Sequence, residues 1–293
     1  MVLNVAQDFS FIEETLSKLD DLDERNLTNI ISYEAAKGVY SHARRFHNTD
    51  QNIKNFWKQR LLEFNTNSLV DNAIECIDYI KQNTPSFNEA YRELESYLPP
   101  YNYSTILYFI IGYDIGIVSD GNAYLNLGHQ LFHEDKRELL YFAMHELHHA
   151  VYTQINPVFS FDDLKTTKNL VNIIKYSTHL EGLAVYCSYN KRRRENEYSH
   201  HDYVTLNDLD KTRKYVARYF EILSIYENES CRLIDDNDFS ILDFMSGGDR
   251  LWYIVGAYMA KLIDEQLGRD TLNKTITDGP ESFFEAYYKT LAD

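Results

Sequence analysis

Glycine, proline and cysteine are scarce in this 293-residue sequence, which contains 11, 5 and 3 of them. An all-β protein needs many turns, and turns depend on glycine and proline, so the composition argues against a loop-rich all-β fold. The three cysteines are too few and too widely spaced for a disulfide framework or a zinc ribbon. We therefore expect Cys76, Cys187 and Cys231 to be buried, reduced thiols, as in a cytoplasmic protein.

Long hydrophobic runs and an excess of positive charge are also absent. The most apolar stretch, residues 106–117, is interrupted by Asp114 and is shorter than the roughly 20 residues of a membrane-spanning helix. Residues 1–10 carry neither the basic nor the apolar segment of a secretion signal. The formal charge of −16 gives a surface that repels phosphate backbones. We expect a cytoplasmic protein that binds neither membranes nor nucleic acid.

Apolar residues recur at helical spacing through most of the chain. The double proline at 99–100 is the clearest internal boundary, because proline cannot continue a helix. After it, the sequence predicts a buried strand at 105–112 and two short strands within 116–128, around a turn at Asp120-Gly121. These patterns predict a mainly helical α+β protein with a small sheet. The expected helices span about 9–19, 27–46, 52–64, 68–80, 86–98, 135–153, 162–190, 207–227, 249–267 and 281–291.

The segment 141–150 contains the pattern His145-Glu146-x-x-His149. On a helix, residues i and i+4 lie one above the other, so both imidazoles can reach a single metal ion. Glu146 projects beside them, where it can accept a proton from a water molecule whose pKa zinc lowers to about 7. The pattern predicts a Zn²⁺ site with His145 and His149 as ligands and Glu146 as general base. The alternative is a helix that carries histidines by coincidence.

Two histidines and a water leave zinc one protein ligand short. The best candidate for that ligand is Glu181, in the segment 179–184 (HLEGLA). Its distance from the histidines along the chain fits one loop and the first half of an antiparallel helix. We expect the small residues Gly182 and Ala184 to let this second helix approach the metal-binding helix closely. The alternative is a solvated glutamate on a helix surface.

These motifs resemble those of the gluzincin metallopeptidases, in which HExxH is followed by a distant glutamate. They are more similar to a group of bacterial predicted Zn-dependent proteases whose HExxH is followed by EGLA. The similarity continues into 247–256 and 267–272, and it covers about residues 101–290. The N-terminal helices lie outside it.

The resemblance implies a zincin-like catalytic region at 101–293, with the small sheet beside the metal-binding helix, after an N-terminal helical region at 1–100. It implies a zinc-dependent peptidase that acts on peptide or protein substrates. The ligands would be His145, His149 and Glu181, and the general base would be Glu146.

The sequence also departs from this family. Val185 stands where thermolysin-like members carry an aspartate, and the GxMEN motif of the aminopeptidases is missing, so the resemblance does not imply aminopeptidase specificity. The family commonly places a tyrosine or histidine on a later helix to stabilise the oxyanion, and Tyr253 resembles that position. Tyr258, Arg250 and His179 are rivals for this role, and Tyr253 has a core aromatic as its alternative interpretation.

The strand expected at 122–127 comes just before the metal-binding helix. As an edge strand it could pair with an extended peptide, and an ordinary hairpin tip is the alternative. Two further functions also remain open. One is a catalytically silent metal-binding scaffold with a zincin fold, and the other is a zinc hydrolase that acts on other amides or esters.

Overall fold

The computed structural model describes residues 2–47, 49–64, 66–160, 163–229 and 231–291. Its contacts divide the chain into two compact units: unit 1 comprises residues 1–95 and 100–151, and unit 2 comprises residues 96–99 and 152–293. The predicted mainly helical α+β class is confirmed, because helices dominate and the strands form one small sheet. The expected domain boundary at the double proline remains a prediction.

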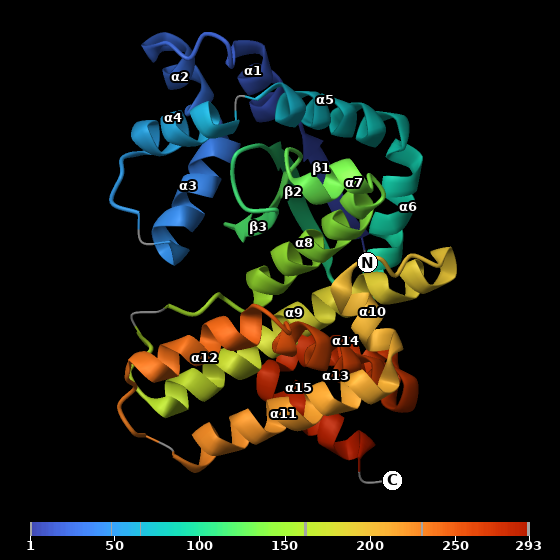
Figure 1. Ribbon diagram of the computed structural model, residues 1–293. Helices are drawn as coiled ribbons and strands as arrows, with labels where there is room; N and C mark the ends of the chain where they lie inside the picture. The colour runs from blue at the N-terminus through green and yellow to red at the C-terminus, as the bar shows by residue number, and fades with distance from the viewer. Residues whose placement is uncertain (1, 48, 65, 161–162, 230, 292–293) are drawn as a thin grey trace. The chain divides into compact units, whose positions relative to one another are not determined.

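The sheet lies in unit 1, and its strands span Val2–Asp8 (β1), Asn102–Ile110 (β2), Gly116–Ser119 (β3) and Asn122–Asn126 (β4) (Figure 1). The strand order is β1-β2-β4-β3. β2 pairs in parallel with β1 and β4, and β3 pairs antiparallel with β4. The predicted hairpin is confirmed, and its turn residues Asp120 and Gly121 have φ values of 52° and 72°, as a tight hairpin requires.

Two expectations about the strands are wrong. Residues 2–8 fall in the region expected to be helical, yet they form β1, which pairs Val2 with Asn102. The local sequence does not predict this strand, because its formation depends on pairing with β2, which is distant in sequence. Residues 122–126 are not an edge strand, since β4 is paired on both sides. The edge strand beside β4 is β3.

Helices of unit 1 pack against one another and against the sheet. The helix predicted at 27–46 is interrupted by a turn in which the Ser32 hydroxyl donates to the Asn29 carbonyl at 2.6 Å. The buried indole of Trp57 donates to the Ala36 carbonyl at 3.0 Å and so joins α4 to α3. The helices span Ser10–Lys18 (α1), Glu24–Ile30 (α2), Glu34–Phe46 (α3), Ile53–Phe64 (α4), Asn67–Gln82 (α5), Thr84–Glu95 (α6), Gln130–Glu134 (α7) and Glu138–Ile155 (α8), the last turn of α8 lying in unit 2.

The described part of unit 2 is helical apart from its loops and one isolated bridge. Its helices span Thr167–Glu195 (α9), His201–Asn207 (α10), Leu209–Asn228 (α11), Asp236–Ser246 (α12), Leu251–Leu267 (α13), Arg269–Asp278 (α14) and Pro280–Thr290 (α15). The sequence does not predict α10, α12 or α14. The first residues of the helix expected at 162–190 lie partly outside the described residues, and α9 begins at Thr167.

Helices α9 and α13 cross with their backbones in contact at Gly182 and Gly256. A Cβ on Gly182 would lie 2.4 Å from the backbone of Gly256, and a Cβ on Gly256 would lie 2.2 Å from the Thr178 carbonyl oxygen. The expectation that Gly182 faces the metal-binding helix is therefore wrong. Its close partner is α13, because only a glycine on each helix allows this approach.

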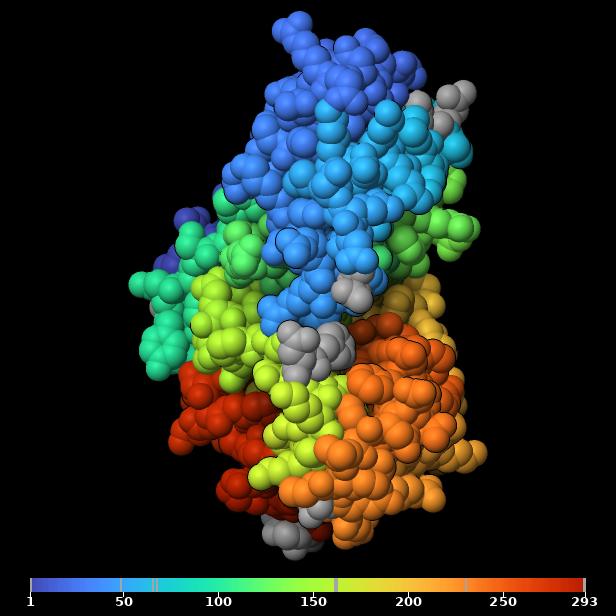
Figure 2. Space-filling view, turned by 90° about the vertical axis from the view of Figure 1, so that its left-hand side faces the viewer, coloured from blue at the N-terminus to red at the C-terminus, as the bar shows by residue number. Residues whose placement is uncertain are grey.

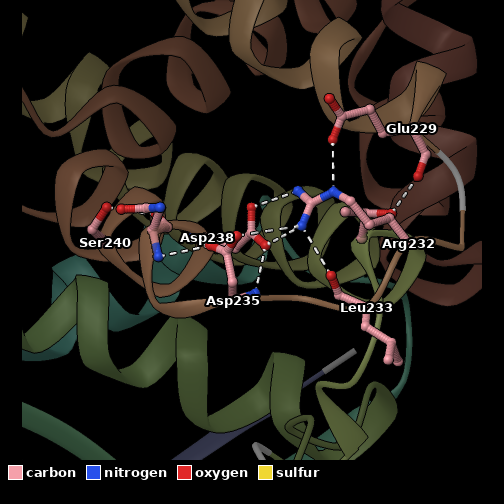
Figure 3. A network of polar contacts seen from close by, with 8 residues as sticks. Glu229, Arg232, Leu233, Asp235, Asp238 and Ser240 are labelled. Carbon is pink, nitrogen blue, oxygen red and sulfur yellow. Dashed lines mark hydrogen bonds and ion pairs between the residues drawn. The ribbon is translucent and has the colours of Figure 1, made fainter.

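A buried carboxylate organises the start of α12. The Arg232 guanidinium donates two hydrogen bonds of 2.8 Å to Asp238 and a third, of 3.0 Å, to Glu229 (Figure 3). Asp238 also accepts the backbone N–H of Asp235 at 2.8 Å. Arg232 holds the pKa of the Asp238 carboxyl below its usual value. The two parallel hydrogen bonds from the planar Arg232 guanidinium to the Asp238 carboxylate thus fix the connection between α11 and α12.

The cysteines only partly follow the expectation of buried thiols. Cys76 and Cys187 are buried and free, as predicted, whereas Cys231 is free and exposed. It has a positive φ of 76° in the loop after α11. Within the described ranges, every helix is too short or too polar to traverse a lipid bilayer.

We predict that Gly182→Ala destabilises the protein by about 1–3 kcal/mol, because its methyl group would meet backbone atoms that cannot rotate away. The free energy of unfolding, measured with urea, tests this. The control is Asn172→Ala, at an exposed position of α9, which we expect to change stability by less than about 0.5 kcal/mol. Equal stability of the two variants would contradict the tight crossing.

Candidate metal centre

The two predicted histidine ligands of unit 1 lie on α8, as the sequence predicts. This helix is fixed by apolar residues such as Leu139, Ala143 and Leu147, which are fully buried. The Nε2 atoms of His145 and His149 are 2.9 Å apart, and their ring planes are 85° apart. Two nitrogens bound to one tetrahedral zinc ion are about 3.3 Å apart, given Zn–N bonds of about 2.0–2.1 Å. A small increase in the distance between the two Nε2 atoms would therefore let the pair bind one zinc ion.

Glu146 is buried, with 6% of its surface exposed, and it lies against the start of β3. A Cβ on Gly116 would lie 2.4 Å from the Glu146 Oε1 atom and 2.6 Å from its Cδ atom. Because Gly116 has no Cβ, the Glu146 carboxylate can occupy the space where a Cβ would lie. Gly116 is not among the site residues predicted from the sequence, although a glycine at the start of a short strand is a recognisable sign of close approach.

His148 has no exposed surface, although it neighbours His149 in sequence. Successive residues of a helix are turned by about 100° from each other. Its ring centre is 6.4 Å from that of His149. His148 packs into the interior.

Glu181, the predicted third ligand, lies in unit 2 on α9 and is partly buried. It directly precedes Gly182, at the crossing with α13. The carboxylate interacts electrostatically with Tyr253 and Arg250, at the start of α13. The glycine crossing thus brings a carboxylate, a phenol and a guanidinium of unit 2 close together.

Tyr253 is partly buried and has a cation over its ring. Burial and the Glu181 carboxylate raise its pKa, and Arg250 opposes them. The Arg250 guanidinium carbon lies 3.6 Å from the centre of the ring. Arg250 also donates hydrogen bonds of 2.7 and 3.0 Å to Asp202, a carboxylate that is 1% exposed. Burial alone would lower the Arg250 pKa, but Asp202 outweighs it and raises that pKa.

The other two rivals for the oxyanion role lie in different surroundings. Tyr258 interacts electrostatically with Tyr287 of α15. On a helix it is turned by about 140° from Tyr253, so the two hydroxyls lie on different faces of α13.

His179 has no exposed surface, and each of its ring nitrogens is engaged. Its Nδ1 is 2.9 Å from the Tyr152 hydroxyl, and its Nε2 is 3.0 Å from the Thr275 hydroxyl. The ring stacks on Phe283 with centres 4.7 Å apart. Burial lowers the pKa of His179 to about 3, so the imidazole is neutral at pH 7. His179 is therefore a core residue of unit 2 with both ring nitrogens engaged.

A histidine pair with an adjacent buried glutamate on one helix is the arrangement of zinc-dependent hydrolases. A family model described as "Putative zinc dependent peptidase (DUF5700)" matches residues 10–292. Because the match covers nearly the whole chain, the protein belongs to this family. It includes the N-terminal helices, which the motif resemblance does not cover. No curated protein and no solved structure matches the chain.

We predict that Gly116→Ala displaces the Glu146 carboxylate while the protein stays folded, because a flexible side chain can move out of the way of a methyl group. A displacement of about 1 Å can lower a catalytic rate about 100-fold. Peptide hydrolysis and thermal unfolding of the variant test this, with Ser119→Ala of the same strand as the control. Full activity in Gly116→Ala would show that the position of Glu146 does not depend on this glycine.

Proposed function

We propose that this protein is a gluzincin-type zinc peptidase in which His145, His149 and Glu181 bind Zn²⁺ and Glu146 is the general base. The observation that carries the proposal is the facing pair of Nε2 atoms, 2.9 Å apart, beside a buried glutamate on the same helix. Membership of the zinc-dependent peptidase family supports the same reading. A set of two imidazoles and a carboxylate is a donor set that can hold a metal ion.

The chemistry of the donor set supports Glu181 as the third ligand. Zinc hydrolases combine two histidines with a third protein ligand that is commonly a carboxylate. Glu181 is a partly buried carboxylate of α9.

Each residue of the proposed site has a separate role in peptide hydrolysis. When bound, zinc would polarise the peptide carbonyl and make the attacking water more acidic. Glu146 accepts the proton of that water and later donates it to the leaving nitrogen. Tyr253 donates its hydroxyl hydrogen to the developing oxyanion, and its raised pKa keeps that hydrogen in place. Arg250 holds the Tyr253 ring from above, and Asp202 holds Arg250.

An extended peptide substrate would pair with β3. This strand is an edge of the sheet, and its first residue, Gly116, contacts Glu146. A peptide that forms β-type hydrogen bonds with β3 would therefore run past the general base. β3 therefore replaces residues 122–127 as the edge strand that we expect to pair with the substrate. A cytoplasmic location, expected from the cysteines, belongs to the same proposal.

We predict that Glu146→Gln retains its zinc but hydrolyses an unstructured, fluorescence-quenched polypeptide about 10²- to 10⁴-fold more slowly, because it loses only the base. Elemental analysis and the hydrolysis rate are measured together. The control is Glu134→Gln, at an exposed position of α7.

Loss of zinc in Glu146→Gln would mean that Glu146 is a ligand. If the zinc-loaded wild type cleaves no polypeptide, a silent scaffold or a hydrolase of other amides or esters would replace the peptidase. A panel of small amides and esters separates those two.

We predict that Glu181→Ala weakens zinc binding by at least about 100-fold, because changes to residues that merely orient a ligand already cost 10- to 100-fold. Competition with a chromogenic chelator measures the affinity, and Glu265→Ala, an exposed position of α13, is the control. An unchanged affinity would assign the third ligand to another residue.

A further inference from the structure

A second group of metal-binding side chains lies in unit 1, outside α8. It consists of His42 and His47 from the C-terminal end of α3 and Asp114 from the segment between β2 and β3. One ligand atom from each lies within 4.8 Å of the others. The His47 Nε2 atom is 3.1 Å from the Asp114 Oδ2 atom, and the two imidazole centres are 6.1 Å apart. Residues remote in sequence therefore converge on one small volume.

The fold holds two of these side chains in place through Tyr113. The Tyr113 hydroxyl is 3.1 Å from His42 Nδ1, and the ring stands at 87° to His42 and 88° to His47. A metal-bound histidine usually engages its second nitrogen in such a hydrogen bond, which orients the ring. With Nδ1 engaged, Nε2 is the nitrogen of His42 that is left for an ion. Gly112, with a φ of 74°, forms the turn that presents Tyr113 and Asp114 to α3.

A cavity of about 580 Å³ gives access to this group. Its walls include His47, Tyr113 and Asp114 together with Arg60, Glu63 and His129. His47 and Asp114 each expose half of their side chains. Figure 2 shows the N-terminal segment of unit 1, which includes α3, in blue at the surface. An ion from solution can thus reach the group without any opening of the core.

The charges around the group are mixed. Arg60 lies 3.6 Å from the Phe56 ring centre and 5.4 Å from that of Tyr113, and Arg45 also interacts with His42. These two cations oppose the binding of a metal ion, whereas Asp114 and Glu63 favour it. The near balance of charge makes the imidazole nitrogens, rather than net negative charge, the main source of affinity. Nitrogen donors favour zinc-like ions over Ca²⁺ and Mg²⁺, which prefer oxygen.

We propose that His42, His47 and Asp114 form a second binding site for a divalent transition-metal ion of the zinc class. The ion joins the end of α3 to the segment between β2 and β3. Asp114 lies two residues before Gly116, so the ion steadies the strand start against which Glu146 packs. The site is independent of the zinc ligands assigned to α8 and α9.

The test counts zinc per chain by elemental analysis after equilibration of the full chain with micromolar Zn²⁺ and removal of free ion. We expect two equivalents in the wild type, one in His47→Ala, one in His149→Ala and none in the double variant. His133→Ala, an exposed histidine of α7 outside both groups, is the matched control and keeps two. Asp114→Asn is expected to behave as His47→Ala does.

A second readout follows unfolding rather than composition. Added Zn²⁺ should raise the midpoint of thermal unfolding of His149→Ala, because an ion that binds only the folded state stabilises it. The same addition should leave His149→Ala/His47→Ala unchanged. Circular dichroism of each variant without zinc establishes that it is folded.

The two proposals fail in different ways. If His47→Ala and Asp114→Asn keep as much zinc as the wild type, or if the second equivalent binds only at millimolar zinc, the second site is overturned. If His149→Ala keeps all its zinc while His47→Ala loses one equivalent, the second site stands and the ligands proposed on α8 fail.

Discussion

A missing Cβ is the constraint on which the arrangement of the candidate residues depends in each of the two units. In unit 1 the hydrogen of Gly116 leaves the space that Glu146 fills, and in unit 2 Gly182 and Gly256 let α9 touch α13. A Cβ at any of these positions would lie 2.4 Å or less from another atom. None of the three glycines has a positive φ, so contact rather than backbone conformation requires them. In a chain with only 11 glycines, such positions are informative.

The glycine crossing also explains the chemistry of unit 2. Glu181 directly precedes Gly182 on one helix, and Tyr253 lies about one turn before Gly256 on the other, so both flank the crossing. Burial and the nearby Glu181 carboxylate raise the Tyr253 pKa, and the stacked Arg250 partly offsets this effect. A phenol that keeps its proton is a hydrogen-bond donor across the physiological pH range. The packing of α9 against α13 thus helps to keep the Tyr253 phenol protonated.

Local patterns predicted the parts of the molecule that local residues determine. Helix α8 and the hairpin turn at Asp120-Gly121 could be located because helical spacing and turn residues are properties of short segments. The motif also selected the histidine pair. By contrast, β1, the interior place of β4 and the partner of Gly182 depend on segments far apart in sequence. The Arg250–Asp202 pair is likewise nonlocal, and no spacing in the sequence indicates it.

The histidines show why residue type alone does not identify a ligand. His179 lies two residues from a proposed ligand, yet hydroxyl groups engage both of its nitrogens and its pKa falls to about 3. Its hydrogen bonds and its stacking on Phe283 account for its place in the core. His145 and His149 instead direct their Nε2 atoms at each other, a geometry that a shared ion satisfies and ordinary packing does not require. What separates the two kinds is the partner of each ring nitrogen, and that partner is set by tertiary structure.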